Sequence, residues 1–279
     1  MISKFRTKKS KHSLSNVFKT RQLNFTSNTN VALQQNHPFL FAQKHALNLY
    51  QKKAIYSFIP KNGCTTLRTS LAIANGFLEN KNLEQHINWV HNNSYTFSAN
   101  LSELACADYT FTVLRCPYER LTSLFLDKFV DKTPVAWNFY RQTNNKYDLD
   151  KLTFSVFLQA LLEQPSLING DIHWRKQVDF LVYQEYDDYF NFDNFDNIRN
   201  TLKNRMNLDL IDTREITNHG KEKYNNIDGN FSTTSVAELK LLKTKSTLPS
   251  TDSLFNNILK ENTKKIYQLD FDLQERIFI

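Results

Sequence analysis

The sequence is poor in cysteine and has no long hydrophobic run. Only 3 of its 279 residues are Cys, and none forms a Cys-x-x-Cys pair. An odd, unpatterned set of cysteines argues against a disulfide-built scaffold and favours a reducing compartment. Without a run of 18 apolar residues, no transmembrane helix is expected, and the first residues lack the apolar core of a secretory signal. We therefore expect a soluble, cytoplasmic protein.

Acidic residues are absent from the N-terminal end of the chain. The first is Glu79, and residues 1–78 carry nine Lys and three Arg, a net charge of +12. The rest holds 23 basic and 28 acidic residues, a net of −5, which gives +7 for the whole chain. This asymmetry favours an anionic ligand or a peripheral membrane contact near the N-terminal part. We interpret residues 1–45 as a basic, flexible extension and residues 46–279 as one domain.

Glycine is also scarce, and one of the five glycines lies in the most informative segment. An apolar, β-prone run from Ala54 to Ile59 precedes a tight loop, and a helix-forming segment follows at residues 65–78. The loop reads Pro60, Lys61, Asn62, Gly63, Cys64, Thr65, Thr66. A strand, a loop and a helix start together form a phosphate cradle, because loop N–H groups and the helix dipole point at an anion. The Walker pattern Gly-x-x-x-x-Gly-Lys-Ser/Thr is missing, because Lys61 precedes the only Gly.

A second polar loop follows a second buried-type strand at residues 109–114. Arg115 closes this strand, Pro117 suits the start of a helix over residues 119–130, and Ser123 lies two turns on. A planar guanidinium and a hydroxyl are suitable phosphate ligands. Further helices are expected at 152–162, 195–206, 235–242 and 254–267, and a third strand at 180–183. Alternating strands and helices predict an α/β fold with a parallel sheet, whose ligands bind beyond the carboxyl ends of the strands.

Both loops resemble motifs of one enzyme family. Pro-Lys-x-Gly-Cys-Thr-Thr resembles the 5′-phosphosulfate loop of carbohydrate sulfotransferases of the chondroitin 4-O and HNK-1 type. The segment Arg115–Lys128 resembles their 3′-phosphate motif, with Cys116 where an acidic residue or His is usual. Two more segments resemble the family's in order, at 171–177 (His-Trp-Arg-x-Gln) and 266–273 (Tyr-x-x-Asp-Phe). Between them, residues 189–196 occupy the place of a Val-Gly-Lys-x-Glu-x-Leu segment, with the Lys and the Glu altered. The resemblance covers about residues 50 to 275.

The resemblance implies a P-loop-NTPase-like sheet flanked by helices and the donor PAPS, 3′-phosphoadenosine 5′-phosphosulfate. Lys61 would neutralise the leaving oxygen, the loop Pro60–Thr66 would hold the 5′-phosphate, and Arg115 with Ser123 would hold the 3′-phosphate. The acceptor would be a carbohydrate hydroxyl, in some cases on a polyanionic glycan, with His173 and Arg175 as substrate contacts. No metal and no nucleic acid are expected.

A general base is needed to remove the acceptor's proton. Related enzymes place a catalytic His about two dozen residues before the Arg of the second motif, and His91 lies 24 residues before Arg115. We therefore predict His91 as the catalytic base, with His86 as the alternative and Glu103 as a weaker choice.

Two other functions remain open on the sequence. The phosphate loop also suits a P-loop-like nucleotide kinase, although the Walker pattern is missing. The basic N-terminal tail alternatively suits a non-catalytic module that binds an anionic ligand or a nucleic acid.

Overall fold

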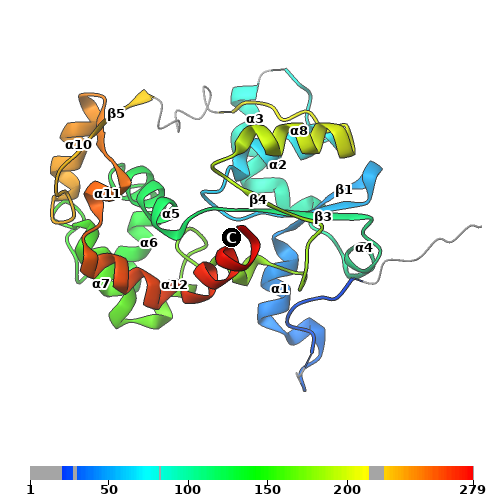
Figure 1. Cartoon of the computed structure of the whole chain (residues 1–279), viewed down its shortest axis with the longest axis horizontal. Coiled ribbons are helices and arrows are strands. Elements are labelled where there is room, and N and C mark those ends of the chain that lie inside the picture. The colour runs from blue at the N-terminus through cyan, green and yellow to red at the C-terminus, as the bar shows by residue number, and fades with distance from the viewer. Residues whose placement is uncertain (1–20, 28–29, 82, 214–222, 279) are drawn as a thin grey trace, which may run out of the picture.

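A four-stranded, mostly parallel sheet forms the centre of the fold (Figure 1). The structure, a computed structural model, describes residues 21–27, 30–81, 83–213 and 223–278. In spatial order the strands are β1 (Ala46–Leu49), β2 (Ala54–Ser57), β3 (Tyr109–Leu114) and β4 (Asp188–Asn191). β2, β3 and β4 run parallel, and β1 is an antiparallel edge. The prediction of an α/β fold with a parallel sheet is confirmed.

Helices cover both faces of the sheet. α2 (Cys64–Ala74), α3 (Leu83–Asn93) and α8 (Phe195–Met206) share one buried cluster with the sheet, and α1 (His37–Lys44) and α4 (Leu101–Ala105) share another. Successive strand residues face opposite sides. In β2, Tyr56 packs in the first cluster and Ile55 in the second. Strands buried on both faces read as continuous apolar runs, which is why β2 and β3 were visible in the sequence.

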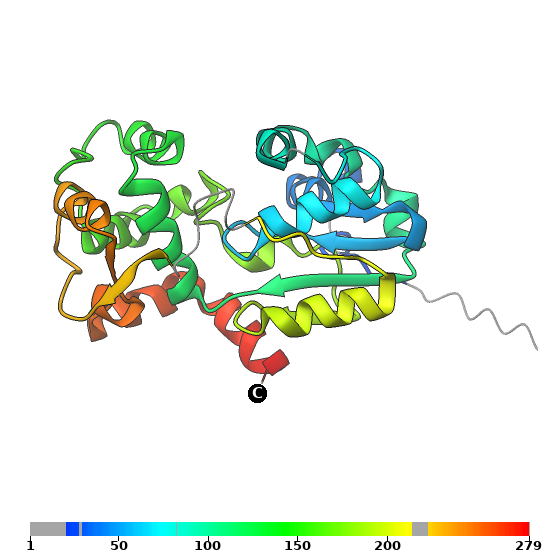
Figure 2. The same cartoon turned by 90° about the horizontal axis from the view of Figure 1, so that it is seen from above.

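A helical lobe stands beside the carboxyl edge of the sheet (Figure 2). The buried side chains of this lobe form a third hydrophobic cluster, which is rich in Phe. Its elements are α5 (Pro117–Leu124), the π-helix η4 (Phe125–Phe129), α6 (Pro134–Gln142), α7 (Phe154–Glu163), α10 (Val236–Thr244), α11 (Thr251–Leu254) and α12 (Asn257–Phe278), with a small parallel pair β5 (Asn225–Ile227) and β6 (Thr247–Pro249). Short 3-10 turns are η1 (Leu33–Gln35), η2 (Tyr50–Lys52), η3 (Ser94–Phe97), η5 (Pro165–Asn169) and η6 (Gln177–Phe180). α12 starts in the lobe and reaches the sheet, where Leu273 joins the α1 cluster.

The predicted third strand at residues 180–183 is wrong. Phe180 is the last residue of η6, and Tyr183 makes only an isolated bridge to Leu23. Its residues are apolar because they fill the cluster under the sheet. The strand that pairs with β3 is the more polar Asp188–Asn191. The helix predicted at 254–267 is split into α11 and the longer α12, and the helix predicted at 119–130 changes to a π-helix after Leu124.

Part of the predicted N-terminal extension packs against the domain. Arg21 forms an ion pair with Asp187 at 2.7 Å and donates to the Ala107 carbonyl. Asn24 donates to the carbonyls of residues 181 and 183, and Phe39 of α1 is buried. Residues 21–27 and 30–45 therefore belong to the folded body, while residues 1–20 lie outside the described residues.

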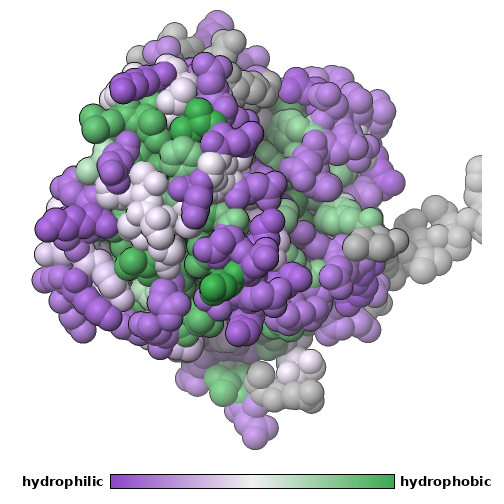
Figure 3. Space-filling view, turned by 60° about the vertical axis from the view of Figure 1, so that its left-hand side comes forward, coloured by the Kyte–Doolittle hydropathy of each residue, from purple (hydrophilic) through white to green (hydrophobic). Residues whose placement is uncertain are grey.

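The surface of the helical lobe carries apolar residues interspersed among hydrophilic ones (Figure 3). Within the described ranges, no helix combines the length and the apolar character that crossing a bilayer demands.

His45 is a buried ionisable residue between α1 and β1. Its Nδ1 lies 2.7 Å from the Phe41 carbonyl, and its ring packs against Phe58 and Phe180. Burial lowers the pKa of His45 to about 4. The folded protein therefore keeps this imidazole neutral over a pH range in which the unfolded chain protonates it.

We predict an acid-dependent loss of stability through His45. Because its folded pKa lies below its unfolded value, its contribution is complete above about pH 6.5 and falls as pH drops toward 4. Between pH 7.5 and 5 this loss should be on the order of 2 kcal/mol. Urea unfolding at both pH values should show it in the wild type and in the control His37→Asn, which alters an exposed residue of α1. In His45→Phe the free energy of unfolding should fall less between the two pH values. The same pH dependence as in the wild type would refute the assignment to His45.

Candidate functional site

The loop after β2 presents backbone N–H groups at the start of α2. Lys61 and Gly63 both adopt left-handed backbone conformations, each with φ of 72°. Gly63 is the N-cap of α2, and neither a side-chain cap nor an acidic residue occupies the first turn. A Cβ on Gly63 would approach the rings of Phe195 and Phe192 to 3.0 and 3.1 Å. The loop therefore needs glycine at this position, and its uncapped N–H groups and helix dipole favour an anion.

Arg115, at the end of β3, is a buried cation with an unused donor. Its side chain is only 6% exposed. Nη1 donates to the Lys61 carbonyl at 3.0 Å, the guanidinium lies 4.5 Å from the Phe192 ring centroid, and Glu119 is 3.4 Å away. Nε is buried without a hydrogen-bond partner among the described residues. Burial lowers the pKa of Arg115, because it disfavours the charged form. An anion at this position would satisfy Nε and stabilise the charge.

Gln177 joins the two loops. Its Oε1 accepts hydrogen bonds from Asn62 Nδ2 at 2.7 Å and from Arg115 N at 3.1 Å. Its Nε2 donates to the Arg115 carbonyl at 2.9 Å. Asn62 Nδ2 also donates to the Val113 carbonyl at 2.8 Å. One buried amide therefore fixes the spacing between the loop after β2 and the loop after β3.

Arg120 connects the loop after β2 to the segment 172–175, and its role is structural. It is 1% exposed and donates to the carbonyls of Pro60, Ile172 and Arg175. The sequence interpretation gave this arginine no ligand role, and the structure shows why it is arginine: three carbonyls from two loops converge on one guanidinium.

The last helix holds the 174–178 segment in place. Tyr267 donates to the Trp174 carbonyl at 2.6 Å. Asp270 accepts from the backbone N–H groups of Gln177 and Val178 at 2.9 and 3.0 Å. Burial raises the pKa of Asp270 to about 6, although the two hydrogen bonds oppose this. The Tyr-x-x-Asp-Phe segment thus supports the site through backbone hydrogen bonds to the segment that carries Gln177.

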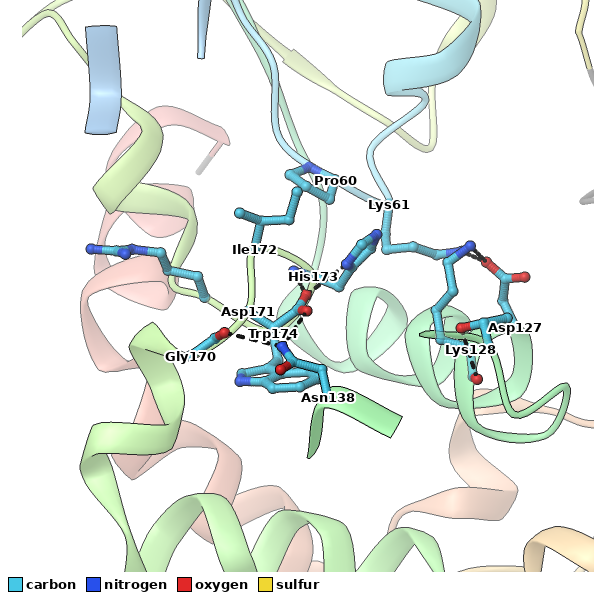
Figure 4. Close-up of polar contacts among 12 residues, drawn as sticks. Pro60, Lys61, Asp127, Lys128, Asn138, Gly170, Asp171, Ile172, His173 and Trp174 are labelled. Atoms are coloured by element: carbon cyan, nitrogen blue, oxygen red, sulfur yellow. Dashed lines mark hydrogen bonds and ion pairs between the residues drawn. The ribbon is translucent and has the colours of Figure 1, made fainter. Parts of the chain in front are cut away.

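Lys61 points into a cluster of charges contributed by η4 (Figure 4). Its Nζ lies 2.6 Å from Asp127 Oδ2, and Lys128 Nζ lies 3.0 Å from the same oxygen. The Lys61 side chain is 13% exposed. Burial lowers the pKa of Lys61, and the Asp127 carboxylate opposes that shift. The Asp127 carboxylate therefore pairs with two ammonium groups beside the loop after β2.

A histidine–carboxylate pair lies beside this cluster. His173 Nδ1 is 2.7 Å from Asp171 Oδ1, and Asn138 of α6 donates to Asp171 Oδ2 at 3.0 Å. In Figure 4 the His173 ring lies between Asp171 and Lys61. Burial lowers the pKa of His173, the Asp171 carboxylate opposes this, and the charges of Lys128 and Lys61 lower it further.

The remaining residues of the two motifs surround these loops. Thr66 Oγ1 lies 2.8 Å from Thr213 Oγ1, inside the fold. Cys64 and Thr65 are half-buried in the first turn of α2, and Ser123 is half-buried in the last turn of α5. Arg175, predicted as a substrate contact, lies 3.8 Å from the Phe41 ring centroid and 3.0 Å from Asp179.

The three residues considered as bases lie on other elements. His91 is an exposed residue in the last turn of α3, and its carbonyl accepts from Arg68 of α2 at 3.4 Å. This contact brings the end of α3 beside the start of α2. His86 lies on the same helix. Glu103 caps α4 through the backbone N–H of Asn100.

Sequence reasoning missed Asp127, Asp171 and Gln177. Asp171 and Gln177 belonged to a matched segment without an assigned role, and so did Asp127 in the segment Arg115–Lys128. Spacing along the chain gives no signal for Asp127 and Gln177, because their partners Lys61 and Asn62 are far away in sequence. Asp171 lies two residues from its partner His173, and this local pair does not reveal its position beside Lys61. Among the described residues, no three His, Cys, Asp or Glu side chains gather as metal ligands.

Comparison with known proteins agrees with this geometry. The sequence model of the sulfotransferase family matches residues 44–274, which include both loops, the 171–177 segment and most of α12. No curated protein and no solved structure matched the chain. The family match extends over most of the 279 residues, and the chain therefore belongs to the sulfotransferase family.

Proposed function

We propose that this sulfotransferase transfers a sulfo group from PAPS to a hydroxyl of a carbohydrate acceptor, as its resemblance to the chondroitin 4-O and HNK-1 type implies. The observation that carries the proposal is the hydrogen bond from Arg115 Nη1 to the Lys61 carbonyl at 3.0 Å. It joins two anion-binding loops at one edge of the sheet. PAPS, when bound, supplies the sulfo group and two separate phosphates.

The residues present fit a ligand with two anionic ends. The uncapped start of α2, with Gly63 to Thr66, suits the 5′-phosphosulfate. Arg115, with its unpartnered Nε, suits the 3′-phosphate, and Ser123 adds a hydroxyl. We assign to Lys61 Nζ the stabilisation of negative charge at the 5′ end by preorganised electrostatics, the same principle as in phosphoryl transfer.

The carbohydrate acceptor is the less constrained half of the proposal. We assign His173 to the acceptor side, since it lies beside the Lys61 cluster. Arg175 is assigned there by the family resemblance, and in this structure its guanidinium contacts Phe41 and Asp179. The lysines at this edge, Lys61 and Lys128, suit a glycan that carries carboxylate or sulfate groups.

Two assays on the full chain test the proposal. Calorimetry should show binding of adenosine 3′,5′-bisphosphate, with ATP binding at least about tenfold more weakly, since a missing 3′-phosphate forfeits about 1.4 kcal/mol or more of charge-assisted hydrogen bonding. Labelled sulfate should pass from PAPS to one or more members of a panel of neutral and anionic glycans. Preference for ATP, with phosphate transfer, would instead indicate a nucleotide kinase.

A truncation separates the enzyme from a tail-based binding module. The shortened chain should begin at Arg21, because Arg21 pairs with Asp187 in the folded body. Sulfate transfer should survive removal of residues 1–20. Loss of transfer in a truncated protein that still unfolds cooperatively would place essential groups in the tail.

A further inference from the structure

We infer that His173, oriented by Asp171, takes the proton from the acceptor hydroxyl. The inference rests on the proposed function and adds to it the identity of the base. His173 becomes the catalytic residue on the acceptor side, and Asp171 becomes a positioning residue that acts through it.

The geometry of the pair is that of an oriented base. Nδ1 of His173 faces Asp171 Oδ1 at 2.7 Å, so the ring carries its proton on Nδ1 and leaves Nε2 as the acceptor. Nε2 makes no hydrogen bond within the described part of the chain. The Asp171 carboxylate is itself fixed, by Asn138 Nδ2 at 3.0 Å and by the His173 backbone N–H at 2.9 Å. A nucleophile's base held by a third group is the arrangement that enzymes of unrelated folds share.

The pair lies beside Lys61, the residue assigned to the leaving oxygen. The His173 ring lies between Asp171 and Lys61 in Figure 4, and the Lys61 charge acts on its pKa. Its side chain is 22% exposed, so an acceptor can reach it from solvent. His91, by comparison, is an exposed residue in the last turn of α3.

The charges around His173 suit a base that is neutral near pH 7. Burial and the ammonium groups of Lys61 and Lys128 lower its pKa, and Asp171 limits the decrease. Asp127 lies between the two lysines and moderates their effect. Other charged groups on packed elements are engaged elsewhere: Arg120 with backbone carbonyls of residues 172 and 175, and Arg175 with Asp179.

The proton transfer and the sulfo transfer together break two bonds and form two. The acceptor O–H bond breaks, its proton moves to His173 Nε2, and its electron pair forms the new O–S bond. The S–O bond to the 5′-phosphate breaks, and its electron pair stays on the phosphate oxygen near Lys61. The imidazolium, stabilised by Asp171, then returns its proton to water.

The experiment compares His173→Asn, Asp171→Asn and His91→Asn, with His37→Asn as a control on α1. His173→Asn should lower kcat about 10²-fold, the range of general-base catalysis. Asp171→Asn should lower it about tenfold or more, because the ring loses its orienting partner. Binding of adenosine 3′,5′-bisphosphate should change less than threefold in both variants. A loss of rate in His91→Asn alone, with His173→Asn at full rate, would overturn the proposal.

The pH dependence of the His173 ring and of kcat distinguishes a catalytic base from a residue that only stabilises the fold. In the wild type, NMR of the His173 ring and the acid limb of kcat against pH should report the same pKa, below the ordinary histidine value. Asp171→Asn removes the carboxylate that raises this pKa, so both should shift to lower pH. A ring titration that is unlinked to the rate would exclude His173 as the base. If the wild type binds no bisphosphate and transfers no sulfate, the proposed function itself is wrong, independently of the pKa of the His173 ring.

Discussion

Replacing Lys61 with methionine is expected to lower kcat for sulfate transfer about 10³-fold or more, the loss seen when a charge-stabilising group is removed from a transfer site. Methionine keeps the length and most of the volume of the side chain and removes only the ammonium. In the structure the Lys61 side chain is 13% exposed, and its ammonium pairs with Asp127 at 2.6 Å beside the loop. Low exposure reduces the screening of this charge by water, whereas the Asp127 carboxylate partly offsets it.

The effect should appear mainly in turnover. The backbone N–H groups of the loop remain in Lys61→Met, so bisphosphate affinity should fall by about tenfold or less, the value of one partly screened charge contact. Lys132→Met, which removes a surface lysine paired with Asp150, serves as the control and should keep wild-type kinetics. Wild-type turnover in Lys61→Met would remove Lys61 from the mechanism.

Replacing Arg115 with methionine is expected to weaken binding of adenosine 3′,5′-bisphosphate about 10²- to 10³-fold, the cost of removing one partner of a buried, hydrogen-bonded charge pair. The Arg115 side chain is 6% exposed, and its Nε has no partner among the described residues. A 3′-phosphate placed there would receive a charge-assisted hydrogen bond from a donor that is already held in position by Lys61 and Phe192.

A comparison of two nucleotides isolates the 3′-phosphate. The wild type should prefer the 3′,5′-bisphosphate to adenosine 5′-monophosphate, and Arg115→Met should lose that preference while its affinity for the monophosphate changes little. If the variant binds both nucleotides more weakly by the same factor, Arg115 acts through the conformation of the loop and not through the 3′-phosphate. Thermal unfolding of the variant must be measured alongside, because Arg115 also donates to the Lys61 carbonyl.

Local patterns in the sequence predicted the two loops correctly. The run before Pro60 and the run before Arg115 are apolar because both faces of β2 and β3 are buried. Pro, Gly and the helix starts then mark where each strand ends. The fourth strand was missed because Asp188–Asn191 carries polar residues, as strands that lie at the edge of a sheet often do.

The contacts that assemble the site could not be predicted from the sequence, because they join distant segments. Gln177 connects Asn62 with Arg115 across 115 and 62 residues. The Asp171–His173 pair is local, yet its position beside Lys61 depends on Arg120, which ties the Ile172 carbonyl to that of Pro60. The prediction of His91 came from its distance to Arg115 along the chain, and such spacing could not show that His173 and Asp171 lie beside Lys61.

The left-handed backbone of Lys61 has a consequence for attempts to stabilise the protein. A φ of 72° is unfavourable for any residue with a side chain, by about 1 kcal/mol, whereas glycine adopts it freely. Burial of the ammonium adds to this penalty. Glycine at position 61 would therefore suit the turn better than lysine does, and a redesign guided by folding energy alone would select it. With the role proposed for Lys61, the most stable sequence and the most active sequence differ at this position.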